Sequence, residues 1–441
     1  MTPRMIIGAA VASLAWPLCA ANAQPRLDGA GRRPTPATAP AGGPFWPQFN
    51  GPRGDNRSPD RDLLKNWPQA GPRLIGTYSG CGAGFSSVSL ADGMIFTAGN
   101  FGADEKVVAM DLSGAPKWTA PNGKAWTSPW GGSRSTPTYN QGTVYQLGAF
   151  GRLAAFDARS GKEAWAVDLP RDGLSQGGFA ESVLIDGNNV LCMLGSREGF
   201  IVALDKKTGS RVWTCQAKRF DHVSYVTPVL VQYGGKRLLI HASYRYLLAV
   251  DPENGKVLWQ LQHNDEPHCS VVASSPVWDN GRILMTFGYG AGTRAFQVSP
   301  SGTEAKQVWK HDASGSEHGG AILDKGFLYT ASNYVYPGGT WSERIAREGK
   351  LYCLDSATGA EKWASPIGRC SVAWADGRLY CLDEFGKMSL IEASPEKCTI
   401  VGELTIPRKE KTYTLSHPVI IGGRLYIRHG DSLFVYDVKA K

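Results

Sequence analysis

Two ionisable residues interrupt a repeated pattern of small residues in this chain. Eight glycines recur 45 to 51 residues apart, at Gly93, Gly142, Gly187, Gly235, Gly281, Gly326, Gly377 and Gly423. About six residues before them stand, in order, Ser87, Thr136, Glu181, Thr227, Ser275, Gly320, Ser371 and His417. Six of these eight are small, so Glu181 and His417 are the candidates for a chemistry that is needed only once, such as general acid or base catalysis.

A second set of side chains lies two residues further upstream in the same units: Phe85, Arg134, Phe179, Tyr225, Ala273, His318, Arg369 and Leu415. Titratable and aromatic groups that converge in this way are typical of a ligand site. We therefore predict one binding surface, formed by Arg134, Glu181, Tyr225, His268, His318, Arg369 and His417. The alternative is that these polar groups only bind water.

The chemistry of this surface depends on its ligand. For an anionic ligand, Arg134 and Arg369 are expected to supply bidentate, charge-assisted hydrogen bonds, and Glu181 to hold a cation or accept a proton. A metal site is not predicted: His222, His268, His318 and Cys269 come from separate units without the short spacing of metal ligands.

The elements that position these residues follow from a repeated phrase. Asp, then Gly four residues later, then Trp recurs in Ala-Phe-Asp-Ala-Arg-Ser-Gly-Lys-Glu-Ala-Trp and its copies, which end at Trp165, Trp213, Trp259 and Trp363. Weaker copies end at Trp118 and Trp309. The Asp and Gly predict a tight turn between two strands. Because these Trp residues occupy the same position in each unit, they predict contacts between neighbouring units rather than a substrate site.

A second hairpin precedes each phrase, for example residues 87–97 around Asp92 and Gly93. Each unit therefore contains four strands, and the eight turn glycines predict eight units. Four-stranded units of this length arranged in a ring are the blades of a β-propeller, so the fold class is all-β, an eight-bladed propeller of antiparallel blades.

The last unit, residues 416–438, holds only three strands. Residues 74–78 form an unmatched strand before the first complete unit. We predict that this strand pairs with the strand around residues 433–436 and closes the ring, which removes an exposed edge.

The Asp-x-x-Thr-Gly-Lys-x-x-Trp phrase resembles the repeat of the pyrroloquinoline-quinone (PQQ) dehydrogenase-like propellers. This family includes quinoprotein alcohol dehydrogenases and an outer-membrane assembly scaffold lipoprotein. The resemblance covers about residues 45–438, and Phe-Trp-Pro-Gln-Phe-Asn-Gly-Pro-Arg-Gly at residues 45–54 resembles the start of secreted PQQ-binding-like repeat proteins, most of which have no established activity.

Two functions follow from the resemblance. A quinoprotein dehydrogenase would hold PQQ over the channel with Ca²⁺ beneath it and an Asp as base. The chain has no adjacent Cys-Cys pair and no Cys-x-x-Cys-His haem motif, both of which occur in such enzymes. The favoured alternative is a binding or scaffold module that contacts a protein or small molecule at the mouth of the channel.

The N-terminal residues predict export. An apolar run from Met5 to Leu18 and the small-x-small site Ala21-Asn22-Ala23 indicate a signal peptide of residues 1–23, cut after Ala23. Trp16 and Leu18 do not fit a lipobox before Cys19. Residues 24–44 are rich in Pro, Ala and Gly and predict a disordered linker, followed by the propeller over residues 45–441. We expect a periplasmic or secreted monomer without a membrane span.

Charge and cysteine content add two expectations. The formal charge of +8 is modest for 441 residues and no dense Lys/Arg run follows the linker, so a nucleic-acid partner is not predicted. Eight cysteines remain after cleavage, but Cys192 with Cys215 and Cys381 with Cys398 would lie two strand spacings apart, which is too far for a disulfide. We therefore expect several buried free thiols.

Overall fold

The computed structural model describes residues 43–440, except residues 129, 173–176, 217–220, 264–271, 289, 333–347 and 409–411. The predicted signal peptide, residues 24–42 of the linker, His268 and Cys269 lie outside this part of the chain. The described residues form 32 strands and no helix. They therefore contain no helix that could span a membrane.

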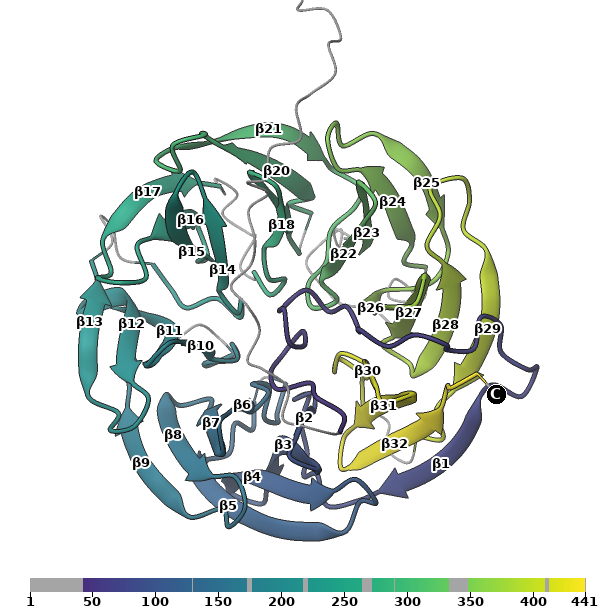
Figure 1. Ribbon diagram of the computed structural model, residues 1–441, viewed down its shortest axis with the longest axis horizontal. Coiled ribbons are helices and arrows are strands. Elements are labelled where there is room, and N and C mark those ends of the chain that lie inside the picture. Colours follow the sequence, from purple (N-terminus) through teal and green to yellow (C-terminus); the bar gives the residue numbers. More distant parts are fainter. Residues whose placement is uncertain are drawn as a thin grey trace, which may run out of the picture.

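The strands form eight four-stranded antiparallel sheets arranged around a centre (Figure 1), which confirms the predicted eight-bladed propeller. The inner strands of blades 1 to 8 are β2 (Ser89–Ala91), β6 (Thr138–Asn140), β10 (Leu184–Asp186), β14 (Val229–Tyr233), β18 (Val277–Asp279), β22 (Ala321–Asp324), β26 (Cys370–Ala375) and β30 (Val419–Ile421). The second strands are β3 (Met94–Phe101), β7 (Thr143–Leu147), β11 (Asn189–Ser196), β15 (Lys236–Ala242), β19 (Arg282–Thr286), β23 (Phe327–Ala331), β27 (Arg378–Asp383) and β31 (Arg424–His429).

The third strands are β4 (Asp104–Asp111), β8 (Arg152–Asp157), β12 (Gly199–Asp205), β16 (Tyr246–Val250), β20 (Thr293–Val298), β24 (Leu351–Asp355), β28 (Lys387–Glu392) and β32 (Ser432–Asp437). The outer strands of blades 1 to 7 are β5 (Pro116–Lys124), β9 (Glu163–Asp168), β13 (Arg211–Cys215), β17 (Val257–Gln262), β21 (Ala305–His311), β25 (Glu361–Ser365) and β29 (Ile400–Thr405). Blade 8 takes its outer strand, β1 (Arg73–Tyr78), from the N-terminal side of the chain.

This pairing of β1 confirms the predicted closure. Leu74 lies opposite Tyr436, and Tyr78 lies opposite Leu433. The first and last parts of the chain therefore share one sheet, as the purple and yellow strands show in Figure 1.

Five of the six repeated Trp residues, those other than Trp259, donate a hydrogen bond from the indole to the next blade. The indole Nε1 of Trp165 donates to the carbonyl of Lys206 over 3.0 Å, and that of Trp213 donates to the carbonyl of Pro252 over 3.1 Å. Trp165, Trp213 and Trp259 are buried, whereas Trp118, Trp309 and Trp363 are half-buried. These tryptophans thus lie between neighbouring units as predicted, and those of blades 2 to 4 are the most buried.

The turn glycines of the phrase have a second role that the turn pattern did not predict. A Cβ atom built on Gly255 would lie 2.5 Å from the Trp213 ring, and one on Gly209 would lie 2.7 Å from the Trp165 ring. Both glycines also have positive φ angles. Glycine is therefore needed both for the turn and for the approach of the indole from the preceding blade.

Residues 45–64 run across the ring (Figure 1) and contact several blades near their Asp-Gly turns. The Trp46 backbone pairs with Leu90 in blade 1, and the Ser58 amide donates to the Trp374 carbonyl in blade 7 over 2.8 Å. In blade 8 the Gly423 amide donates to the Asp60 carboxylate over 2.7 Å. The opposite end of the ring, where the loops that lead into the inner strands lie, is the mouth of the propeller.

All seven cysteines in the described part of the chain are free thiols, which confirms the expectation of several unpaired cysteines. Six are buried, among them Cys192, Cys353 and Cys381. Burial raises the pKa of the Cys353 thiol to about 12, so this group behaves as a small core residue rather than a nucleophile.

Candidate functional site

The structure divides the predicted site residues into three groups. Arg369, His318 and His417 form one polar network in blades 6 to 8. Arg134 and Tyr225 lie together at the start of blades 2 and 4. Glu181 stands apart, in the core between blades 3 and 4. His268 lies outside the described residues.

Arg369 is held between two carboxylates. It lies directly before β26, and its Nη2 atom is 3.0 Å from Glu384 Oε1 and also contacts the Glu317 carboxylate. Glu384 follows β27 in the hairpin at the mouth, where His318 Nε2 lies 3.0 Å from the same Oε1 atom. One carboxylate oxygen therefore receives both Arg369 and His318.

The charges around Glu384 set its protonation state. Burial alone would raise the pKa of this carboxyl, but its hydrogen bond and electrostatic interaction with His318, and the positive charge of Arg369, outweigh that effect. The net result is a lowered pKa. Glu384 is therefore an anion that anchors the network rather than a proton donor.

His417 is buried and both of its ring nitrogens are engaged. Nε2 lies 2.6 Å from the His318 carbonyl oxygen, and Nδ1 lies 3.3 Å from Asn56 Nδ2. Because a carbonyl only accepts, Nε2 carries the hydrogen and Nδ1 accepts. Burial lowers the pKa of His417 to about 4, so the ring stays neutral.

The Arg134 guanidinium donates hydrogen bonds to backbone carbonyl groups. Its Nη1 atom donates to the Gly177 carbonyl and its Nη2 atom to the Trp130 carbonyl. The guanidinium also lies 5.9 Å from the centre of the Trp126 ring, a cation–π distance. These contacts tie together the loops that lead into blades 2 and 3.

Glu181 pairs with a histidine that the sequence analysis did not select. Its Oε2 atom lies 3.1 Å from Nε2 of His241, and its other oxygen accepts from the Met193 amide. Both residues are almost fully buried. Burial raises the pKa of Glu181, although its hydrogen bond to His241 opposes the shift. The predicted acid or base role of Glu181 would thus require a ligand to enter the core.

Three aromatic side chains in successive contact cross the mouth, from the surroundings of Arg134 to those of Glu384. Trp130, from the loop before blade 2, contacts Tyr413, from the loop before blade 8, with ring centres 5.7 Å apart. Tyr413 in turn contacts Phe385, the neighbour of Glu384, at 6.1 Å. Trp130 is 48% exposed and has a φ angle of 54°. Trp130 therefore presents an aromatic side chain to solvent at the mouth.

A buried carboxyl beneath this surface was also missed from the sequence. Glu105, at the start of β4, is 1% exposed. Its Oε1 atom accepts from Gln146 Nε2 and its Oε2 atom from the Ala149 amide, both over 3.2 Å. Glu105 occurs on a third strand, whereas the sequence comparison covered only the positions that lead into the inner strands.

Glu105 should make stability fall as pH rises. Burial raises the pKa of its carboxyl from 4.5 to about 7, against the opposing hydrogen bonds. The folded protein therefore holds this proton more tightly than the unfolded chain does, so the stabilisation is complete below about pH 4.5 and is lost as pH rises through about 7. We expect Glu105→Gln to be more stable than the wild type at pH 8 by about 2–3 kcal/mol.

Urea unfolding at pH 5 and at pH 8 measures this difference. The control is Glu163→Gln, at an exposed carboxylate on β9, which should leave the pH dependence unchanged. The same pH dependence in wild type and Glu105→Gln would show that Glu105 does not cause it.

Comparison with known proteins identifies the family. A sequence profile of the family described as outer membrane protein assembly factor BamB matches residues 103–365, which is more than half of the chain. The chain belongs to this PQQ-repeat propeller family. The family confirms the resemblance that the repeated phrase indicated.

Similar curated proteins have two kinds of function. Quinoprotein alcohol dehydrogenase PedH of Pseudomonas putida is 26% identical over 255 residues, which cover 53% of this chain and 38% of that protein. The 1-butanol dehydrogenase (quinone) of Thauera butanivorans is 33% identical over 161 residues, 31% of this chain and 24% of that enzyme. BamB of Moranella endobia is 22% identical over 282 residues, 59% of this chain and 65% of that protein. The match thus spans less than two thirds of the length of each of these relatives.

Solved structures share the propeller fold. BamB from Moraxella catarrhalis has a TM-score of 0.58 at 15% identity, covering 84% of this chain and 99% of that one. A europium-containing methanol dehydrogenase has a TM-score of 0.64 at 13% identity, covering 88% and 90%. The fold of this chain is therefore shared by BamB and by a methanol dehydrogenase.

Proposed function

We propose that this protein is an exported, noncatalytic propeller that binds a protein partner at its mouth. The observation that carries the proposal is that the cationic groups there bind groups of the protein itself, while the aromatic side chain of Trp130 is exposed. Arg369 contacts two carboxylates, and Arg134 contacts two carbonyls. Export rests on the predicted signal peptide.

The residues of the mouth that the structure describes do not match the charge of an anionic quinone. A quinone carboxylate would have to displace Glu317 or Glu384 from Arg369, and it would meet the remaining carboxylate at close range. Glu181, the predicted cation ligand, is directed to His241 and the Met193 amide in the core.

Trp130 has the properties of an interface anchor. Large aromatic side chains dominate the binding energy of protein interfaces when they are centrally placed and rigid. The contact with Tyr413 and the hydrogen bond that the Trp130 carbonyl accepts from Arg134 hold this residue in place. A partner that covers the ring would bury its apolar face without rearranging the charges beneath it.

The second candidate function is a quinone-dependent alcohol dehydrogenase. It is favoured by similarity to enzymes with that activity, which reaches 33% identity over 161 residues. Under this alternative, Arg369 would release a carboxylate when the cofactor enters. A cofactor titration therefore distinguishes the two functions.

Site-directed photo-crosslinking in the native host tests the partner surface. A photoreactive phenylalanine analogue at Trp130 should give one covalent adduct of defined mass. The same analogue at Lys207, which is exposed in the Asp205–Gly209 turn on the opposite face, should give none. Equal adducts at both positions, or none at position 130, would contradict the proposal.

A further inference from the structure

Two buried cysteines of blade 7 contact each other through their thiols. Cys370 is the first residue of β26, and Cys381 lies on β27, the strand beside it. Val372 lies opposite Cys381 in the antiparallel register, so the two cysteines are diagonal neighbours on one face of the sheet. A hydrogen bond joins the two thiols. The contact therefore lies inside the core cluster between blades 6 and 7.

Two further cysteines pack against the same core cluster but have different partners. The Cys353 thiol, on β24 of blade 6, is hydrogen-bonded to the Tyr329 hydroxyl. The Cys398 thiol, before β29, is hydrogen-bonded to the Ser365 hydroxyl. The structure thus matches Cys370 with Cys381 by direct contact.

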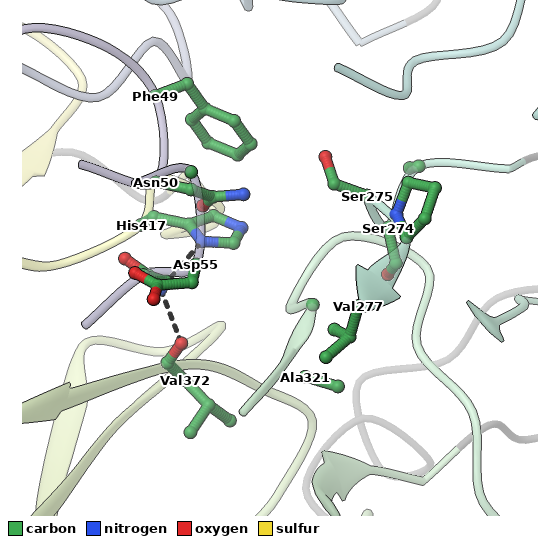
Figure 2. Close-up of a pocket in the computed structure, with 14 residues that line it drawn as sticks. Phe49, Asn50, Asp55, Ser274, Ser275, Val277, Ala321, Val372 and His417 are labelled. Atoms are coloured by element: carbon green, nitrogen blue, oxygen red, sulfur yellow. Dashed lines mark hydrogen bonds between the residues drawn. The ribbon is translucent and has the colours of Figure 1, made fainter. Parts of the chain in front are cut away.

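The strand that carries Cys370 is held along both of its edges. On one edge it pairs with β27 over residues 370–375. On the other edge the Val372 carbonyl, labelled in Figure 2, accepts a hydrogen bond from Asn56 Nδ2, and the Trp374 amide donates to the Asn56 carbonyl over 3.0 Å. The folded chain therefore keeps the two thiols together, which is the arrangement that a disulfide between neighbouring strands requires.

We propose that Cys370 and Cys381 form a disulfide bond when the chain folds in an oxidising compartment. The inference rests on the export proposed above, because thiols of cytosolic proteins are kept reduced. It adds a covalent modification to a protein whose described cysteines are all thiols in this structure.

The reaction is thiol–disulfide exchange with a disulfide oxidant such as oxidised glutathione. One cysteine thiolate attacks the oxidant, forms a mixed disulfide and releases one glutathione thiolate. The second cysteine thiolate then attacks the mixed disulfide, which forms the Cys370–Cys381 bond and releases the second glutathione. The two cysteines lose two electrons to the oxidant, and their two protons end on the two glutathione thiols.

The bond should form before blade 7 closes. Cys370 and Cys381 are each 1% exposed in the folded protein, so an oxidant has no direct access to them. Burial also raises the pKa of the Cys381 thiol well above its usual range, and the thiolate is the form that reacts. Exchange therefore belongs to folding, when both thiols are still accessible.

The bond would link the two strands that present the polar network of the mouth. Arg369 directly precedes Cys370, and Glu384 follows Cys381 by three residues. Arg369 Nη2 and Glu384 Oε1 lie 3.0 Å apart. A covalent link at Cys370 and Cys381 would keep the strands of this ion pair together if the blade opens.

Peptide mapping of the refolded protein tests the bond. The purified protein is reduced and unfolded in urea, refolded with reduced and oxidised glutathione, and its remaining thiols are blocked with N-ethylmaleimide. Trypsin cleaves after Arg369, Arg378 and Lys387, so residues 370–378 and 379–387 carry one cysteine each. We expect these two peptides to be joined, with a mass about 2 Da below the sum of their thiol forms. Refolding in vitro does not require export, so failure of the bond and failure of the proposed export are distinguished.

Matched serine variants and a urea control complete the test. Cys381→Ser should abolish the joined peptides, whereas Cys353→Ser, at a buried thiol of the same core cluster, should retain them. Oxidation in urea should give several pairings, because the unfolded chain does not select one. The proposal would be overturned if refolded wild type lacked the joined peptides, if either peptide were joined to the Cys398 peptide instead, or if refolded and urea-oxidised protein gave the same mixture.

Discussion

Arg428→Ala should destabilise the protein by about 3–5 kcal/mol. Arg428 lies on β31 in the last blade and is 2% exposed. Its Nη1 atom donates to Ser86 O, Thr97 Oγ1 and Ala98 O, and its Nη2 atom to Cys81 O and Gly82 O. Truncation would leave these buried acceptors of blade 1 without their donor. One side chain therefore links the last blade to the first.

Equilibrium urea unfolding measures this loss of stability. Two further variants on β31 show whether it comes from the hydrogen bonds of Arg428. Arg428→Lys keeps the charge but not the five-donor geometry, so it should recover only part of the lost stability. Arg424→Ala removes a half-exposed arginine with a 3.3 Å bond to Leu112 O and should change stability by less than about 1 kcal/mol. Equal losses for Arg428→Ala and Arg424→Ala would show that the buried network does not hold the ring closed.

Trp213→Ala should cost about 3–5 kcal/mol, as large-to-small core substitutions do. The Trp213 indole is buried, packs on Gly255 and donates to the Pro252 carbonyl of the next blade. Its removal would leave a cavity between blades 3 and 4 and an unpartnered carbonyl. Thermal or urea unfolding measures the loss.

Trp130→Ala is the control for size and residue type. Trp130 lies at the mouth, outside the repeated phase, and is largely exposed, so its loss should change stability by less than about 1 kcal/mol. Similar losses in the two variants would mean that position in the repeat does not determine the role of a tryptophan in this fold.

The repeat predicted the fold because it carries the same physical requirement several times. Turn glycines, Asp residues and tryptophans at a constant spacing each follow from blade geometry, so strand number, blade number and the pairing of residues 74–78 could be deduced before the structure. The contact between Gly255 and Trp213 could not, because two residues in successive phrases become neighbours only when blades pack.

The site was predicted less completely. Arg369, His318 and His417 were selected because they differ from the residues at equivalent positions in other units. In the structure these three residues belong to one network. Their partners were missed. Glu384 lies in a hairpin at the mouth that the positional comparison did not include, and Asn56 reaches His417 from 361 residues away. The sequence contains no local signal for such contacts.

Spectroscopic titration of the purified protein with PQQ and Ca²⁺ tests whether the charged groups at the mouth bind each other rather than a quinone. We expect no saturable change in the quinone spectrum with wild type, and none with Arg369→Ala or Glu181→Gln. Saturable 1:1 binding by wild type that is lost in Arg369→Ala would contradict it and establish the quinone-dependent alternative.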